Sequence, residues 1–192
     1  MESLIVSTGV VALAEMGDKT QLLAFLLAAR FKKPVPIILG IFVATVLNHS
    51  LAGALGAWIT TVLSPSVLRW VLGLSFIAMA AWTLIPDKIE EEEAAVASRF
   101  GVFGATLITF FLAEMGDKTQ IATVAMAAHY AMPVMVVIGT TLGMLIADVP
   151  AVFLGGKLAE KIPLRLVHGI AAAIFAVLGI ATLLGAGSRL GF

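Results

Sequence analysis

The sequence AEMGDKTQ occupies residues 14–21 and returns unchanged at residues 113–120. Each copy places a glutamate, an aspartate and a lysine within an otherwise apolar stretch of chain. An ionisable side chain at the centre of a bilayer costs about 2.5 to 3.5 kcal/mol on the insertion scale. Because the chain accepts this cost at two matching places, we expect these charges to serve a function.

The composition predicts an integral membrane protein. Hydrophobic residues make up 60% of the chain, charged residues only 12%, and the mean hydropathy is +1.07, whereas soluble domains carry about 25% charged residues. A spanning helix needs about 20 mostly apolar residues, and six stretches satisfy this requirement. They are residues 3–29, 35–61, 67–86, 101–128, 133–156 and 164–186.

The duplication extends beyond the motif. An offset of 99 residues also matches Pro34 with Pro133, and an offset of 96 matches Leu68 with Leu164. Three helices per half is an odd number, so the second half must enter the membrane from the opposite face. The sequence thus predicts an all-α polytopic membrane protein with six transmembrane helices in two inverted three-helix repeats, an arrangement common in secondary transporters. The first repeat, an acidic linker and the second repeat are expected at residues 1–86, 87–99 and 100–192.

Lysine and arginine residues predict the orientation. Eight lie on the side of the linker: Arg30, Lys32, Lys33, Lys88, Arg99, Lys157, Lys161 and Arg165. Only Arg69 and Arg189 lie on the other side. The positive-inside rule therefore puts the linker in the cytoplasm and both termini outside.

Several classes of activity are not indicated. The chain has no cysteine, which excludes thiolate metal sites and catalytic thiols within it. It has no phosphate-binding loop, so transport would draw on ion gradients. No basic stripe suggests nucleic acid. We expect no cofactor and no enzymatic activity, and the sequence leaves the oligomeric state open.

The motif acids form the candidate site. Glu15 lies about 18 Å into its helix, near the middle of the membrane, and Glu114 is placed similarly. Asp18 and Asp117 share a helix face with these glutamates. If the two helices meet, four carboxylates converge, and they repel one another unless a cation or protons neutralise them. The pattern predicts a site that exchanges a divalent cation for protons.

Oxygen ligands suit magnesium, calcium or manganese, and magnesium sheds its water reluctantly, so calcium or manganese is favoured. Four side chains are candidates for neutral oxygen ligands: Thr20, Gln21, Thr119 and Gln120. On a straight helix they point away from the glutamates. Gly17 and Gly116 would allow the helix to open, so we expect a kink or unwinding there.

The motif lysines allow two interpretations. Lys19 and Lys118 are either counter-charges that hold Glu15 or Asp18 in an ion pair when no metal is bound, or ordinary glutamate–lysine pairs four residues apart on a helix. The sequence does not decide between them.

A second set of polar residues lies in the next helix of each half. His49 and Asp148 are equivalent at the 99-residue offset, and Asn48 adjoins His49. Asp148 is a candidate ligand or proton relay, because acids within a membrane span usually mark a pathway. His49 is a candidate proton carrier or a packing residue.

Two copies of E-x-G-D-K-[ST], each in the first helix of a three-helix repeat and joined by an acidic linker, resemble the family of Golgi-type calcium and manganese transporters and the bacterial manganese exporters of the MneA type. The resemblance covers essentially the whole chain. It implies export of Mn²⁺, or of Ca²⁺, against protons across a bacterial inner membrane, with the motif acids Glu15, Asp18, Glu114 and Asp117 as ligands.

Two alternatives from other classes remain at this stage. An intramembrane aspartyl protease also needs two facing aspartates, but Glu15 and Glu114 stand where its Gly-x-Gly-Asp signature requires glycine. A carrier of an organic solute such as an amino acid would use the lysines and helix ends to hold a carboxylate. Four acids against two lysines make the site net negative, which disfavours that anion.

Overall fold

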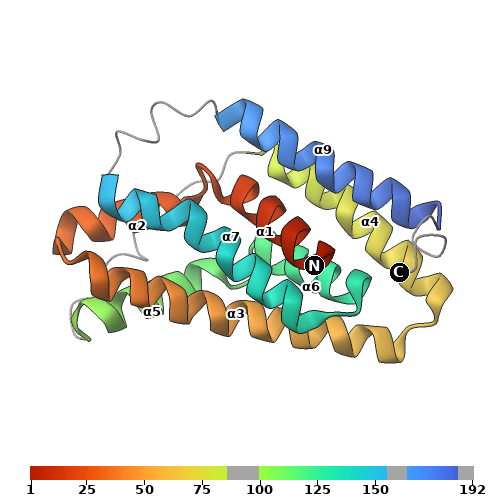
Figure 1. Ribbon diagram of the computed structural model, residues 1–192, viewed down its shortest axis with the longest axis horizontal. Coiled ribbons are helices and arrows are strands. Elements are labelled where there is room, and N and C mark those ends of the chain that lie inside the picture. The colour runs from red at the N-terminus through yellow and green to blue at the C-terminus, as the bar shows by residue number, and fades with distance from the viewer. Residues whose placement is uncertain (86–99, 155–163, 186–192) are drawn as a thin grey trace.

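The computed structural model describes residues 1–85, 100–154 and 164–185, which form eight helices (Figure 1). The first half contains α1 (Glu2–Glu15), α2 (Lys19–Phe31), α3 (Pro34–Val62) and α4 (Pro65–Thr83). The second half contains α5 (Gly101–Glu114), α6 (Lys118–Tyr130), α7 (Pro133–Leu154) and α9 (Leu164–Leu183). The expected linker at 87–99 and five of the basic residues used for the orientation lie outside the described residues. Those five are Lys88, Arg99, Lys157, Lys161 and Arg189.

The length and apolar surface of the helices are those of a membrane protein. Four of the described helices, α3, α4, α7 and α9, are long and apolar enough to cross a bilayer. Large apolar side chains such as Trp58, Leu74 and Val177 are exposed on their outer faces, as expected where lipid is the surrounding medium. The chain is therefore a polytopic, helical, integral membrane protein.

The expected spans 3–29 and 101–128 are not single helices. The motif divides the first into α1 and α2, and the second into α5 and α6. α1 has 14 residues and α2 has 13, so they measure about 21 and 20 Å. Neither would cross a hydrocarbon core of about 30 Å alone. The two helices of each pair together are long enough.

Each pair of short helices packs mainly on the long helix of the other half. α1 and α2 pack against α7, whereas α5 and α6 pack against α3, and α4 runs beside α9 (Figure 1). The two halves are therefore interlocked, and the ends of α1 and α5 meet in the interior of the molecule.

Glycines allow these close helix contacts. A Cβ atom at Gly40 would lie 2.7 Å from the Thr106 side chain on α5, and one at Gly139 would lie 2.7 Å from the Leu4 carbonyl oxygen on α1. One turn further along α7, a Cβ at Gly143 would lie 2.7 Å from the Thr8 carbonyl oxygen. Small residues let membrane helices approach in this way, and dispersion forces then hold them together.

We predict that Gly143→Ala destabilises the protein by about 1 to 3 kcal/mol, because the added methyl group meets backbone atoms that cannot rotate away. The measurement is thermal unfolding of purified protein in detergent. Gly9→Ala is the matched control, since nothing lies within 4 Å of a Cβ at Gly9. Equal melting temperatures for Gly143→Ala and the wild type would contradict the close α1–α7 contact.

Candidate cation site

The motif folds into the same tight turn in both halves. Met16 has φ −63° and ψ 114°, Gly17 has φ 81°, and the Asp18 amide donates to the Glu15 carbonyl oxygen at 3.0 Å. These values define a type II β-turn, whose third position requires a positive φ and therefore favours glycine. At the second motif the Asp117 amide donates to the Glu114 carbonyl oxygen at 3.1 Å, and Gly116 has φ 77°. The turn ends one helix after the glutamate and begins the next after the aspartate.

The motif glutamines hold the turns closed. The Gly17 amide donates to Gln21 Oε1 at 2.9 Å, and the Gly116 amide donates to Gln120 Oε1 at 2.8 Å. The sequence suggested that these two oxygens could bind a metal. In this structure they satisfy backbone N–H groups that the break leaves without a helical partner. The function proposed below does not depend on Gln21 and Gln120 as ligands.

The motif threonines orient the glutamates. Thr20 Oγ1 donates to Glu15 Oε2 at 2.6 Å, and Thr119 Oγ1 donates to Glu114 Oε2 at 3.1 Å. Each bond fixes one carboxylate oxygen. The other oxygen, Oε1, is buried in both glutamates and has no hydrogen-bond partner among the described residues.

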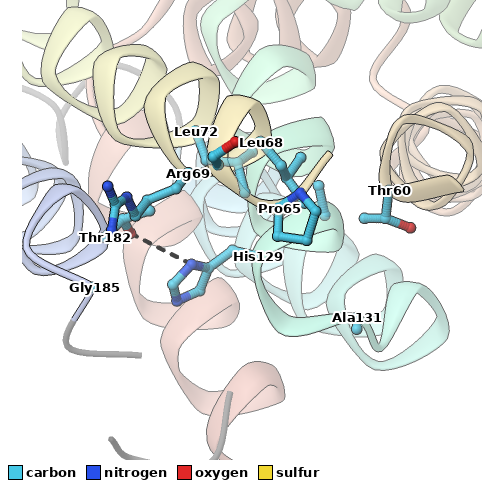
Figure 2. Close-up of a pocket in the computed structure, with 11 residues that line it drawn as sticks. Thr60, Pro65, Leu68, Arg69, Leu72, His129, Ala131, Thr182 and Gly185 are labelled. Atoms are coloured by element: carbon cyan, nitrogen blue, oxygen red, sulfur yellow. Dashed lines mark hydrogen bonds between the residues drawn. The ribbon is translucent and has the colours of Figure 1, made fainter. Parts of the chain in front are cut away.

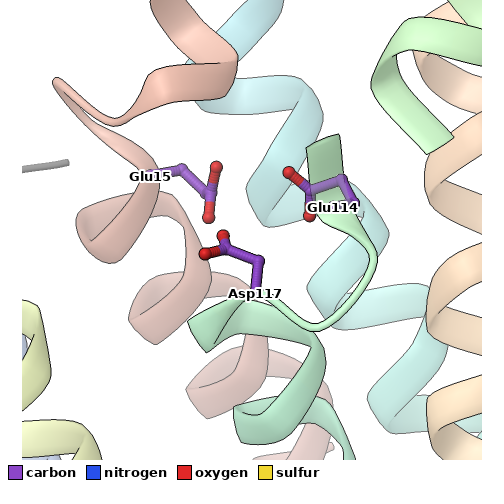
Figure 3. A group of neighbouring side chains, drawn as sticks. All are labelled: Glu15, Glu114 and Asp117. Carbon is purple, nitrogen blue, oxygen red and sulfur yellow. The ribbon is translucent and has the colours of Figure 1, made fainter. Parts of the chain in front are cut away.

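Three carboxylates converge at the breaks. Glu15, Glu114 and Asp117 each offer an oxygen, and these oxygens lie within 4.8 Å of one another (Figure 3). Glu15 comes from the end of α1, Glu114 from the end of α5 and Asp117 from the start of α6. Both glutamates are fully buried and Asp117 is 5% exposed. Such a group can hold a cation that prefers oxygen ligands.

The lysines form ion pairs between the two motifs. Lys118 Nζ lies 2.7 Å from Asp18 Oδ1, and Lys19 Nζ lies 3.7 Å from Asp117 Oδ1. The interpretation as helical pairs four residues apart is wrong, because the turn separates each glutamate from its lysine. Lys118 pairs with Asp18, one of the two acids that the counter-charge interpretation named, whereas Lys19 pairs with Asp117, which it did not name. Asp18 therefore lies against a buried lysine and not in the carboxylate triad.

Asn48 has a supporting position. Its Nδ2 donates to the Phe111 carbonyl oxygen at 3.0 Å, and its Oδ1 accepts from Gln120 Nε2 at 3.4 Å. At the equivalent place in the other half, Gln21 Nε2 donates to the Ala147 carbonyl oxygen at 2.9 Å. Each motif glutamine thus joins its turn to the long helix of the other half.

Asp148 and His49 are buried beside this level of the structure. Neither is exposed, and none of their side-chain oxygen or nitrogen atoms has a hydrogen-bond partner among the described residues. Asp148 lies close to both Glu15 and Glu114. Asp148 is therefore a neighbour of the triad, although its carboxylate is not one of the three converging groups.

The sequence analysis did not identify His168 on α9. Its Nε2 lies 2.6 Å from the Met16 carbonyl oxygen, which the turn has removed from the helical ladder. The residue that matches His168 in the first half, at the offset of 96, is Leu72. That mismatch, which lies between the matching pairs Val71–Val167 and Gly73–Gly169, was the available signal.

A separate cavity of about 590 Å³ lies where the α3–α4 connection meets the ends of α6 and α9 (Figure 2). Arg69, His129 and Thr182 are its principal polar residues, and Thr182 lies 3.4 Å from His129 Nδ1. No residue of either motif lines it. We therefore place the candidate site at the motif carboxylates and not in this cavity.

A membrane protein whose interrupted helices bring buried carboxylates together at one place is, as a class, an ion transporter. Within that class, the chain belongs to the GDT1 family. The family profile, described as "Divalent cation/proton antiporter GDT1", matches residues 3–91 and 102–189. This confirms the resemblance seen in the motifs.

Curated relatives support the same family. A Vibrio cholerae protein named "Putative manganese exporter" is 52% identical over 183 residues, which cover 95% of this chain and 90% of that protein. The rice "GDT1-like protein 3" is 30% identical, over 91% of this chain and 71% of its own length. A GDT1-like protein of Synechocystis is 28% identical, over 87% and 91% of the two chains. No solved structure matches the chain.

Membership in this family makes the chain a cation transporter and not an enzyme. The aspartyl protease alternative is therefore wrong. The ion pairs agree with this, because Asp18 and Asp117 each lie near a lysine, whereas a protease dyad must share a proton between two facing carboxylates.

We predict that Gly116→Ala destabilises the protein by about 1 to 2 kcal/mol, because alanine pays a steric cost at positive φ. Nothing lies within 4 Å of a Cβ at Gly116, so the loss would come from the backbone alone. Gly116→Asn should lose less stability than Gly116→Ala, since asparagine tolerates this conformation better. Thermal unfolding in detergent is the measurement, and Gly169→Ala, in open space at ordinary φ, is the control. Unfolding of Gly116→Ala at the wild-type temperature would exclude the type II turn.

Proposed function

We propose that this protein exchanges a divalent cation for protons and binds the cation at Glu15, Glu114 and Asp117. The observation that carries the proposal is the convergence of three buried carboxylate oxygens within 4.8 Å of one another. A cluster of acids alone would be weak support. The buried Oε1 atoms of both glutamates have no hydrogen-bond partner among the described residues, and a cation would supply the missing partner.

The charges around the site support exchange with protons. Among the residues that the structure describes, five acids are buried here and two lysines face them: Glu15, Asp18, Glu114, Asp117 and Asp148 against Lys19 and Lys118. With all groups ionised the site carries three negative charges. A divalent cation leaves one negative charge, which a proton can neutralise. When the cation leaves, further protons must replace it, because buried carboxylates at this spacing repel strongly.

The ligand chemistry limits the cargo to hard or intermediate cations. Carboxylate oxygens suit Ca²⁺, Mn²⁺ and Mg²⁺, and the chain has no cysteine to favour softer metals. We propose Mn²⁺ as the physiological cargo, moved out of the cytoplasm, with Ca²⁺ as the alternative. The name of the Vibrio cholerae relative supports manganese. The family description names a divalent cation, which argues against an organic solute as cargo.

We further propose that the chain crosses the membrane six times as two inverted repeats, residues 1–86 and 100–192, joined by the linker at 87–99. α1 with α2, and α5 with α6, would each make one interrupted span that brings its break to the middle of the bilayer. Both termini would lie outside and the linker in the cytoplasm, by the distribution of basic residues. The membrane would be the bacterial inner membrane.

The remaining candidate residues take supporting roles. Thr20 and Thr119 orient the glutamates by donating hydrogen bonds to Glu15 and Glu114. Because each hydroxyl hydrogen points to a glutamate, the lone pairs of each hydroxyl oxygen can also serve as cation ligands. Asn48 positions the second turn through Gln120. We assign Asp148 to proton transfer. His49 is a second candidate for that transfer, because its buried nitrogens have no partner among the described residues.

The test is ion flux in proteoliposomes, comparing Mn²⁺, Ca²⁺ and Mg²⁺ with and without a pH gradient. We expect Mn²⁺ to move and to respond to the gradient. Glu15→Gln, Glu114→Gln and Asp117→Asn should each lower flux at least tenfold, since even groups that only orient a ligand are worth about 10- to 100-fold. Glu2→Gln, on the exposed start of α1, is the matched control and should transport normally. Normal transport by the three site variants would overturn the proposal.

Asp148→Asn separates cation binding from proton transfer. Because Asp148 is outside the triad, we expect this variant to exchange Mn²⁺ for Mn²⁺ across the vesicle membrane. Net Mn²⁺ flux driven by a pH gradient should be lost. The measurement compares the two modes in one preparation. Loss of both modes would make Asp148 a ligand, and retention of both would remove it from the pathway.

A further inference from the structure

The two motifs have identical sequences but different ion pairs. Lys118 Nζ lies 2.7 Å from Asp18 Oδ1, and both side chains are 1% exposed. Lys19 Nζ lies 3.7 Å from Asp117 Oδ1, and the Lys19 side chain is 23% exposed. The first distance is that of a close ion pair, whereas the second is that of a looser one. The sequence of the motif itself therefore does not cause the difference.

The difference decides which aspartate faces the two glutamates. Asp117, whose lysine is more distant, belongs to the triad with Glu15 and Glu114. Asp18, whose lysine is close, does not. Each aspartate thus has two potential positive partners, which are a lysine from the other motif and the cation.

The outer pair of helices shows a matching asymmetry. α9 packs against α1, and α4 packs against α6. Exchanging the two halves replaces α1 by α5, α6 by α2 and α9 by α4. The repeat would therefore equally allow α4 to contact α5 and α9 to contact α2. His168 on α9 binds the Met16 carbonyl oxygen of the first turn, whereas the equivalent Leu72 on α4 cannot donate a hydrogen bond to Met115. The α4–α9 pair therefore occupies one of two related positions, and His168 stabilises this one.

We infer that Lys19 and Lys118 are positioning residues that exchange roles during transport, so that Asp117 completes the cation site in one state and Asp18 completes it in the other. In the described state Lys118 neutralises Asp18. In the opposite state Lys19 closes on Asp117, Lys118 withdraws, and Asp18 joins Glu15 and Glu114. This inference rests on the proposed function, because it describes how that site changes sides.

Alternation of the two lysines has a physical advantage. A buried carboxylate without a positive partner costs several kcal/mol, so a site that simply released its cation would be unstable. With two lysines alternating, the aspartate that leaves the cation gains a lysine, and the aspartate that leaves its lysine gains the cation. Both glutamates remain with the cation throughout.

Cysteine cross-linking can read the two states, because the chain has no cysteine of its own. Met16→Cys with His168→Cys reports the described state, in which these residues are in contact. Leu72→Cys with Met115→Cys are the equivalent positions and report the opposite state. Each pair is treated with a short bifunctional thiol reagent in proteoliposomes containing Mn²⁺. Each lysine substitution is compared with its own cysteine parent.

Lys118→Gln should lower cross-linking of the first pair and raise that of the second, changing their ratio at least about tenfold, because it leaves Asp18 buried without its lysine only in the described state. Lys19→Gln should shift the ratio in the opposite direction. Lys118→Arg keeps the charge, so its cross-linking ratio should stay near that of the parent. Adding Asp18→Asn to Lys118→Gln removes the uncompensated carboxylate and should return the ratio toward the parent.

A shift in the same direction for both lysine variants, or no shift in either, would overturn the inference. If Lys118→Gln does not fold, Lys19→Gln carries the test alone, and failure to raise cross-linking of the first pair overturns the inference. Mn²⁺ flux by the wild type is measured in vesicles of the same composition. Absence of wild-type flux together with opposite shifts would refute the cation cargo but keep the lysine exchange, so the two failures are distinguishable.

Discussion

Repulsion among buried carboxylates is the constraint on which the rest of this structure depends. Five acids lie away from water around the ends of two short helices, and two lysines face them. Such a group is stable only when positive charge is shared efficiently among its members. Interlocking of the halves achieves this, because each motif lysine pairs with the aspartate of the other motif. Neither half could hold its own acids in this way if it folded alone.

The interrupted helices follow from the same constraint. A straight helix would direct Thr20 away from Glu15, and it would place Lys19 one turn from Glu15 on a single face. The type II turn instead brings Thr20 onto the Glu15 carboxylate and releases the lysine to reach across the interface. Gln21 then satisfies the amide that the turn exposes. The glutamate, glycine, aspartate, lysine, threonine and glutamine of the motif therefore each have a geometric task, which is a physical reason for the identity of the two copies.

The asymmetry of the halves is as informative as their similarity. Identical motifs make one short and one long ion pair, and a histidine on α9 holds one turn where a leucine stands at the matching place on α4. A symmetric arrangement would leave both aspartates between a lysine and the glutamates at once. Breaking the symmetry separates the tasks, so one aspartate lies with a lysine and the other with the glutamates. A transporter built from two related halves can reverse that choice with small movements of side chains and of the α4–α9 pair.

The sequence by itself determined the membrane class, the duplication, the acids of the candidate site and the family, because hydropathy and an exact repeat are properties of the linear chain. It also located the break at Gly17 and Gly116, since glycine within a buried charged motif indicates an unusual backbone. Only the tertiary structure decided which carboxylates converge and which lysine neutralises which aspartate. It also gave Gln21 and Gln120 to the turns and revealed His168. Those outcomes depend on how two halves that are far apart in the chain pack against each other. Pairing across such an interface leaves no periodic signal in the sequence.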